Sequence, residues 1–177
     1  SSLPSKPPLI HKIVRVDHAG ELAADRIYAG QMAVLGKTEC GPSIKKMWEE
    51  EKNHLDEMER LSAKYSVPLS LFSPVFSIAG YVLGASSALA GKEGAMGCTV
   101  AVEELIGSHY NEQIKELLEK APEEKELLGT LSKLRDDELH HLHVGKDQGG
   151  EKSTLFSPLK MVVQGGCKVA IAIAERV

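Results

Sequence analysis

Two copies of the motif Glu-x-x-His constrain what this chain can fold into. Glu51 and His54 form the first copy, Glu138 and His141 form the second, and a Leu follows the His in each. Side chains three residues apart on an α-helix project from one face about one turn apart, so each pair can bind one metal ion. A single copy is a weak signal, because helix surfaces carry this spacing by chance. Two copies with matching neighbours favour a helical metal site.

An internal repeat adds a further glutamate to each copy. Seven residues of α-helix rotate by about 700°, so a Glu and a Tyr at this separation lie on one helix face. The sequence therefore predicts two helix pairs, each with one single Glu, a Tyr beside it and one Glu-x-x-His. Each half has a Glu, a Tyr and a Gln at relative positions 0, +7 and +10, namely Glu21, Tyr28 and Gln31, and then Glu103, Tyr110 and Gln113.

Four such helices can bring four carboxylates and two imidazoles into the interior of a bundle. This is the ligand set of ferritin-like di-iron and di-manganese proteins, in which two helices supply a Glu and two supply a Glu-x-x-His. Two divalent cations neutralise four carboxylates that would be costly to bury without them. Carboxylate-rich sites with few imidazoles suit iron or manganese. The candidate ligands are Glu21, Glu51, His54, Glu103, Glu138 and His141.

Neighbouring residues compete for two of these assignments. Glu104 follows Glu103 in the sequence but points about 100° away from it on a helix, and the repeat selects Glu103. His140 and His143 flank His141, which is selected because a Leu follows it, as after His54. We expect Glu104, His140 and His143 to lie outside the ligand set, with the two histidines solvated.

Two acids next to the motifs are candidates to orient the imidazole rings. Asp137 precedes His141 by one helical turn and is expected to hold its ring nitrogen. Glu50 is expected to do the same for His54. The alternative that both acids are ordinary solvated side chains remains open.

Helical periodicity and the placement of Gly and Pro predict a chain of helices and no strand. A chain of 177 residues is expected to form one domain, residues 1–177, with a flexible N-terminus at residues 1–8. The predicted fold class is all-α, a ferritin-like four-helix bundle with two additional apolar helices. The predicted helices cover residues 9–35, 41–65, 74–91, 92–119, 122–145 and 158–176.

Charge and cysteine content limit the function classes. The net charge is −4 and the Lys and Arg residues are scattered, so we expect no nucleic-acid partner. Cys40, Cys98 and Cys167 are far apart and match no CxxC spacing, which predicts reduced thiols of an intracellular protein. Residues 1–8 resemble neither a secretory signal nor a transit peptide. The alternative that a presequence was removed earlier stays open.

Residues 65–91 contain no formal charge, which raises the question of a membrane. Prolines, serines and glycines interrupt the segment, so a spanning helix is disfavoured. A helix in a membrane interface and a helix in the protein core are equal alternatives. If this segment and residues 158–177 form an apolar face that includes Phe76 and Leu83, we expect peripheral membrane binding, and homo-oligomers when lipid is removed.

The sequence resembles the demethoxyubiquinone hydroxylases, the di-iron monooxygenases of ubiquinone biosynthesis. The resemblance covers about residues 10–177, and none of the family's iron ligands is missing from this sequence. It is carried by the segments RVDHAGE at 15–21, RIYAGQ at 26–31, GKEGAM at 91–96, CTVAVEE at 98–104 and HYN at 109–111.

The resemblance implies that the six candidate ligands bind two iron ions, with His109 and Tyr110 beside the metals and the quinone. The implied activity is hydroxylation of the ring of a demethoxyubiquinol with O2 and reducing equivalents. The implied location is peripheral, on the matrix side of the inner mitochondrial membrane or on a bacterial inner membrane. A polyprenyl quinone is almost insoluble, so the implied partners are the membrane surface and a lipid-binding accessory protein of ubiquinone biosynthesis.

An alternative from another class is a ferritin-like iron-storage or ferroxidase protein with the same ligands and no organic substrate. The uncharged residues 65–91 argue against it, because a soluble storage cage does not need such a surface. A helical adaptor with a vestigial site is a further alternative, and the intact ligand set argues against that.

Overall fold

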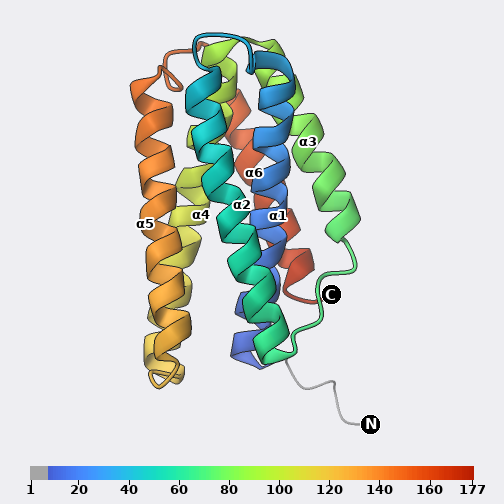
Figure 1. The fold of residues 1–177 in the computed structure, drawn as a ribbon, viewed down its shortest axis with the longest axis vertical. Helices are drawn as coiled ribbons and strands as arrows, with labels where there is room; N and C mark the ends of the chain where they lie inside the picture. Colours follow the sequence, from blue (N-terminus) through green and yellow to red (C-terminus); the bar gives the residue numbers. More distant parts are fainter. Residues whose placement is uncertain (1–7) are drawn as a thin grey trace.

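The computed structural model describes residues 8–177, in which the chain forms α-helices and contains no strand. Figure 1 shows the long helices running side by side, with α5 at one side of the bundle and α3 at the other. The all-α fold class is confirmed. The helices are α1 (Leu9–Leu35), α2 (Gly41–Tyr65), α3 (Ser73–Leu89), α4 (Lys92–Lys120), α5 (Lys125–Asp147) and α6 (Phe156–Ala174).

The predicted helix bounds are close to the observed ones, except at the start of α5. Pro122 was expected in the first turn of this helix, and that expectation is wrong. The backbone N–H of Glu124 donates to the carbonyl of Ala121 over 3.1 Å, which closes a turn with Pro122 at its second position. Proline is favoured there because its fixed φ suits the turn. The predicted flexible N-terminus lies, apart from Pro8, outside the described residues.

The helices that carry the candidate ligands are α1, α2, α4 and α5. Their apolar residues pack into separate clusters above and below a buried polar centre. One cluster includes Ile13, Met58 and Leu127, and another includes Leu35 and Ile44. The ligand positions lie between these residues along α1 and α2, so the polar centre is enclosed by the core at both ends.

Helix α3 lies directly against α1 because glycines allow the two backbones to meet. A Cβ atom on Gly84 would lie 1.9 Å from the carbonyl oxygen of Ile27. A Cβ atom on Gly30 would lie 2.3 Å from the carbonyl oxygen of Tyr81. Both contacts are too close for a side chain, which explains a glycine inside α1 despite its low helix propensity.

One face of α3 packs on the bundle and the opposite face is exposed. Ile78 and Val82, one turn apart, are 68% and 58% exposed. Phe76 was expected on the apolar outer face, and this is wrong: its side chain is only 8% exposed and packs with Val16 and Ala19 of α1. Leu83 is half-buried for the same reason, because it points toward α1 and α4.

Helix α6 packs on α4 and α1 and also leaves an apolar face exposed. Arg15 of α1 holds its C-terminal end by donating hydrogen bonds of 2.7 Å to the carbonyls of Ala174 and Glu175. Met161 and Val162 are largely exposed. By length and composition alone, α6 would be able to cross a membrane.

Candidate metal centre

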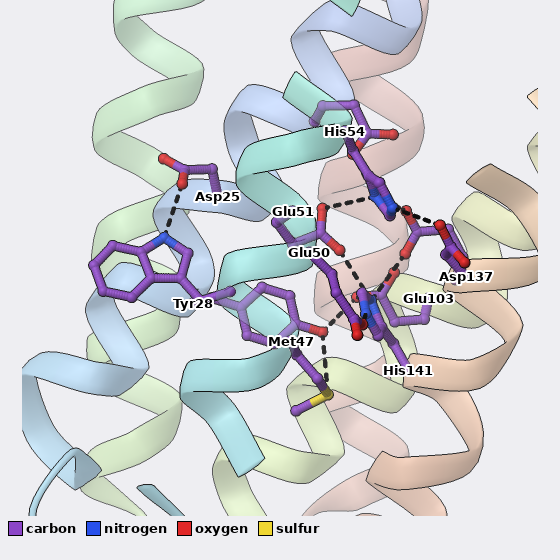
Figure 2. Close-up of polar contacts among 12 residues, drawn as sticks. Asp25, Tyr28, Met47, Glu50, Glu51, His54, Glu103, Asp137 and His141 are labelled. Carbon is purple, nitrogen blue, oxygen red and sulfur yellow. Dashed lines mark hydrogen bonds and ion pairs between the residues drawn. The ribbon is translucent and has the colours of Figure 1, made fainter. Parts of the chain in front are cut away.

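The structure brings the predicted ligand residues together in the middle of the bundle. Helix α1 contributes one Glu, α4 contributes one Glu, and α2 and α5 each contribute a Glu and a His from one face. All six side chains are at most 2% exposed. Figure 2 shows four of them, Glu51, His54, Glu103 and His141, converging from α2, α4 and α5. The six are Glu21, Glu51, His54, Glu103, Glu138 and His141.

The side chains form two overlapping groups that can each hold a metal ion. Within each group the ligand atoms lie within 4.8 Å of one another. Glu51 and Glu138 belong to both groups, whereas each of the others belongs to one. The arrangement therefore suits two neighbouring cations that share two carboxylates. The groups are Glu21, Glu51, His54 and Glu138, and Glu51, Glu103, Glu138 and His141.

Buried atoms without partners support this fit. Each of the six residues has at least one buried oxygen or nitrogen that lacks a hydrogen-bond partner among the described residues. In both histidines the atom is Nδ1, which lies 3.2 Å from Glu138 Oε1 in His54 and 3.0 Å from Glu51 Oε1 in His141. Unpartnered buried polar atoms are costly, and a divalent cation would bind them.

The Nε2 atoms of the two histidines contact carboxylates on the opposite helix. His54 on α2 lies 3.0 Å from Asp137 Oδ2 on α5, and His141 on α5 lies 2.7 Å from Glu50 Oε2 on α2. The sequence-based pairing of each acid with the histidine on its own helix is therefore wrong. Because Nδ1 of each ring faces the centre, Nε2 points across to the neighbouring helix (Figure 2).

Two buried tyrosines hold the single glutamates of the opposite half. Tyr28 of α1 donates from its hydroxyl to Glu103 of α4 over 2.7 Å. Tyr110 of α4 donates to Glu21 of α1. Burial and the adjacent carboxylate raise the pKa of both tyrosines well above the usual value. Both therefore stay protonated and fix one oxygen of each glutamate.

Charge in the metal-free centre is set by burial and by carboxylate–imidazole contacts. Burial alone would lower the pKa of His141, but the adjacent Glu138 and Glu51 raise it to about 12. The pKa of His54 is raised in the same way, mainly by Glu138 and Glu21 against the effect of burial. Burial raises the pKa of Glu51 to about 7. Protons thus offset part of the charge that cations would neutralise.

The metal-free protein is expected to lose stability as the pH rises from about 5 to about 7. The pKa of Glu51 is about 7 when folded and 4.5 when unfolded, so the folded state holds a proton that the unfolded state has released. Raising the pH therefore favours unfolding, by up to about 1.4 kcal/mol per pH unit for one proton. Urea unfolding of chelator-treated protein at several pH values would measure this. A free energy of unfolding that stays constant or rises contradicts it.

The residues that compete with the ligand assignments in the sequence lie outside the metal centre. Glu104 pairs with Lys160 of α6 at 2.5 Å instead of facing the interior. His140 and His143 are exposed on α5, as expected. Cys40 and Cys98 are buried and Cys167 is half-buried, all as free thiols.

An open pocket borders the centre at Glu21. Helices α1, α3, α4 and α6 surround it, and most of its lining is apolar. His109 and Tyr110, which the family resemblance placed beside the quinone, both line it. Asp17 lines it as well and was not identified from the sequence. Helical spacing offered a signal, because Asp17 precedes Glu21 by one helical turn and so lies on the same face. The remaining lining includes Ala19, Ala23, Ile27, Phe76, Ile106 and Ile171.

Comparisons with known proteins agree with the geometry. The family model described as ubiquinone biosynthesis protein COQ7 matches residues 8–174. A Caenorhabditis elegans protein named NADPH-dependent 3-demethoxyubiquinone 3-hydroxylase, mitochondrial, is 63% identical over 174 residues, which cover 98% of this chain and 93% of that protein. The human protein of the same name is 51% identical over 168 residues, covering 94% and 77%. A Rhodospirillum rubrum 3-demethoxyubiquinol 3-hydroxylase is 38% identical over 175 residues, covering 98% and 81%. The chain therefore belongs to the COQ7 family of ubiquinone biosynthesis proteins.

Proposed function

We propose that this protein is a di-iron monooxygenase that hydroxylates the ring of a demethoxyubiquinol-type polyprenyl quinone. The observation that carries the proposal is the apolar pocket that reaches Glu21 at the edge of the metal centre. An iron-storage protein needs no such pocket for an organic molecule. The relatives are named as hydroxylases of 3-demethoxyubiquinone or 3-demethoxyubiquinol, which supports the same reading.

The residues of the chain would bind the metal and position it. Iron bound there would activate O2 and relay electrons from the reductant, so that one oxygen atom is inserted into the ring and the other leaves as water. Glu51 and Glu138 would be shared by the two ions, because both belong to both ligand groups. Asp137 and Glu50 would fix the orientation of the histidine rings through Nε2, which leaves Nδ1 free for the ion. Iron is preferred over zinc because the site is rich in carboxylates.

The pocket would hold the quinone ring and exclude water. Its polar side chains come from α1 and α4, so the ring would lie there, beside Glu21, His109 and Tyr110. The side chains that α3 and α6 contribute to the pocket wall, including Phe76, are apolar apart from the thiol of Cys167. A polyprenyl tail would lie along this part of the wall. Reducing equivalents would come from NADPH, which the names of several relatives mention.

The proposed location is the membrane surface that stores the substrate. The exposed apolar faces of α3 and α6 would dock there, on the matrix side of the inner mitochondrial membrane; several relatives are named mitochondrial. A bacterial inner membrane would be the equivalent for a prokaryotic chain. A lipid-binding accessory protein would be an additional partner on the same faces, and homo-oligomers would form through them without lipid. We also propose a single domain for the chain.

Isotope labelling tests the proposed reaction. Iron-loaded protein is mixed with a short-tailed demethoxyquinol and ¹⁸O₂, with NADPH as reductant. We expect a hydroxylated ring that carries one ¹⁸O atom, while the other atom leaves as water. Mass spectrometry of the quinone measures the label. Oxidation of iron to a ferric mineral with an unaltered quinone would instead support the storage alternative.

A further inference from the structure

Asp17 is a buried carboxyl in the pocket wall that is not part of the proposed ligand set. It lies on α1 one turn before Glu21 and is 4% exposed. Gln113 of α4 donates a hydrogen bond from Nε2 to its Oδ1 over 2.8 Å. The second oxygen, Oδ2, is buried and has no hydrogen-bond partner within residues 8–177. An unpartnered buried oxygen costs folding free energy, so its presence beside a pocket points to a ligand.

The internal repeat provides a matched position without this feature. Thr99 of α4 precedes Glu103 by one turn, as Asp17 precedes Glu21, and Gln31 approaches it as Gln113 approaches Asp17. The distance from Gln31 Nε2 to Thr99 Oγ1 is 3.4 Å. Thr99 is buried and does not line the pocket. The two halves therefore share the glutamine, and of the two matched positions only the one that lines the pocket carries a carboxyl.

The surroundings of Asp17 favour a neutral carboxyl. Burial raises its pKa well above the usual value, Glu21 adds to this, and the hydrogen bond from Gln113 opposes it. A protonated carboxyl can donate one hydrogen bond and accept others. With Oδ1 occupied by Gln113, Oδ2 is the atom that can bind a neighbouring carbonyl or hydroxyl oxygen.

We propose that Asp17 binds an oxygen on the quinone or quinol ring through Oδ2 and thereby orients the ring toward Glu21. This inference rests on the proposed function, because it needs a quinone in the pocket. Its chemistry is specific to a ring that carries oxygen atoms, since an apolar ring of similar shape has no atom for Oδ2 to bind. Asp17 thus acts on substrate orientation and would not hold metal.

Binding measurements with paired ligands test this assignment. The iron-loaded protein is titrated without O2 or reductant, once with a short-tailed demethoxyquinone and once with a decylbenzene that lacks ring oxygens. We expect Asp17→Leu to weaken quinone binding by roughly tenfold, the effect of losing one buried hydrogen bond, with binding of decylbenzene unchanged. Thr99→Val is the matched control and should bind both ligands like the unaltered protein. Iron content is measured for every variant.

Asp17→Asn provides a second test that conserves shape. Its carbonyl oxygen still accepts from Gln113, so its amide N–H faces the ligand. We expect binding of both quinone and quinol to be kept, because a ring carbonyl oxygen and a ring hydroxyl oxygen can each accept from this N–H, as from the O–H of the neutral carboxyl. Loss of quinone binding by about tenfold or more in Asp17→Asn, with full iron content, would overturn the proposal, even if Asp17→Leu does not fold.

Two other outcomes are equally decisive. Equal weakening of quinone and decylbenzene by Asp17→Leu would show a structural role and overturn the proposal. If Asp17→Leu weakens quinone binding selectively, but the unaltered protein binds the quinone without hydroxylating it, the Asp17 assignment is supported. The proposed reaction is then overturned instead.

Discussion

Replacing Glu51 or Glu138 with alanine is expected to remove both metal ions and to reduce turnover by roughly a thousandfold or more. Both carboxylates belong to both ligand groups, so either change removes a ligand from each ion. Each ion would keep ligands from only three side chains, and the shared bridge between the ions would be incomplete. Iron per chain, measured by mass spectrometry after anaerobic loading, tests the first effect, and product formation tests the second.

Glu21→Ala and Glu103→Ala give an internal comparison, because each residue belongs to one group. These variants should lose one ion more readily than the other, and so retain more iron than the variants at the shared positions. Glu49→Ala is the surface control: Glu49 lies on the same helix as Glu51, is exposed and pairs only weakly with Lys45 at 3.7 Å. Full iron content in both Glu51→Ala and Glu138→Ala would rule out the proposed ligand assignment.

Placing aspartate at both Ile78 and Val82 is expected to weaken binding to liposomes by well over tenfold. The two side chains are exposed, one turn apart, on the outer face of α3. A charge at the centre of a bilayer costs about 2.5 to 3.5 kcal/mol, and less at its interface, so two charges exceed the 1.4 kcal/mol of a tenfold change. Co-sedimentation with liposomes measures binding, and turnover of a long-tailed quinone should fall with it.

The iron content of this double variant should be unchanged, because α3 carries none of the proposed ligands. Asn53→Asp combined with Asn111→Asp is the charge-matched control, since both residues are exposed on helices that carry ligands. Phe76 is unsuitable for the same experiment, because it is buried and lines the pocket. If the Ile78 and Val82 double variant keeps full liposome binding and full activity on a long-tailed quinone, α3 is not a docking surface.

Much of the fold and the composition of the candidate site were predictable from the sequence. Helix bounds follow from apolar periodicity and from Gly and Pro, which act within a few residues along the chain. The spacing of Glu51 and His54 likewise defines one helix face without knowledge of any other helix. The repeat then pairs Glu21 with Glu103. These features are local in the sequence, or are copies of a local pattern.

Contacts between helices were decided only by the tertiary structure. The pairing of Asp137 with His54 and of Glu50 with His141 depends on the relative rotation and axial position of α2 and α5, which no spacing within one helix specifies. The burial of Phe76 likewise depends on which face of α3 packs on α1. Such choices are set by side-chain packing between segments far apart in the chain. The sequence therefore determined which ligand residues face the interior of the bundle, and packing between the helices determined which partners they meet there.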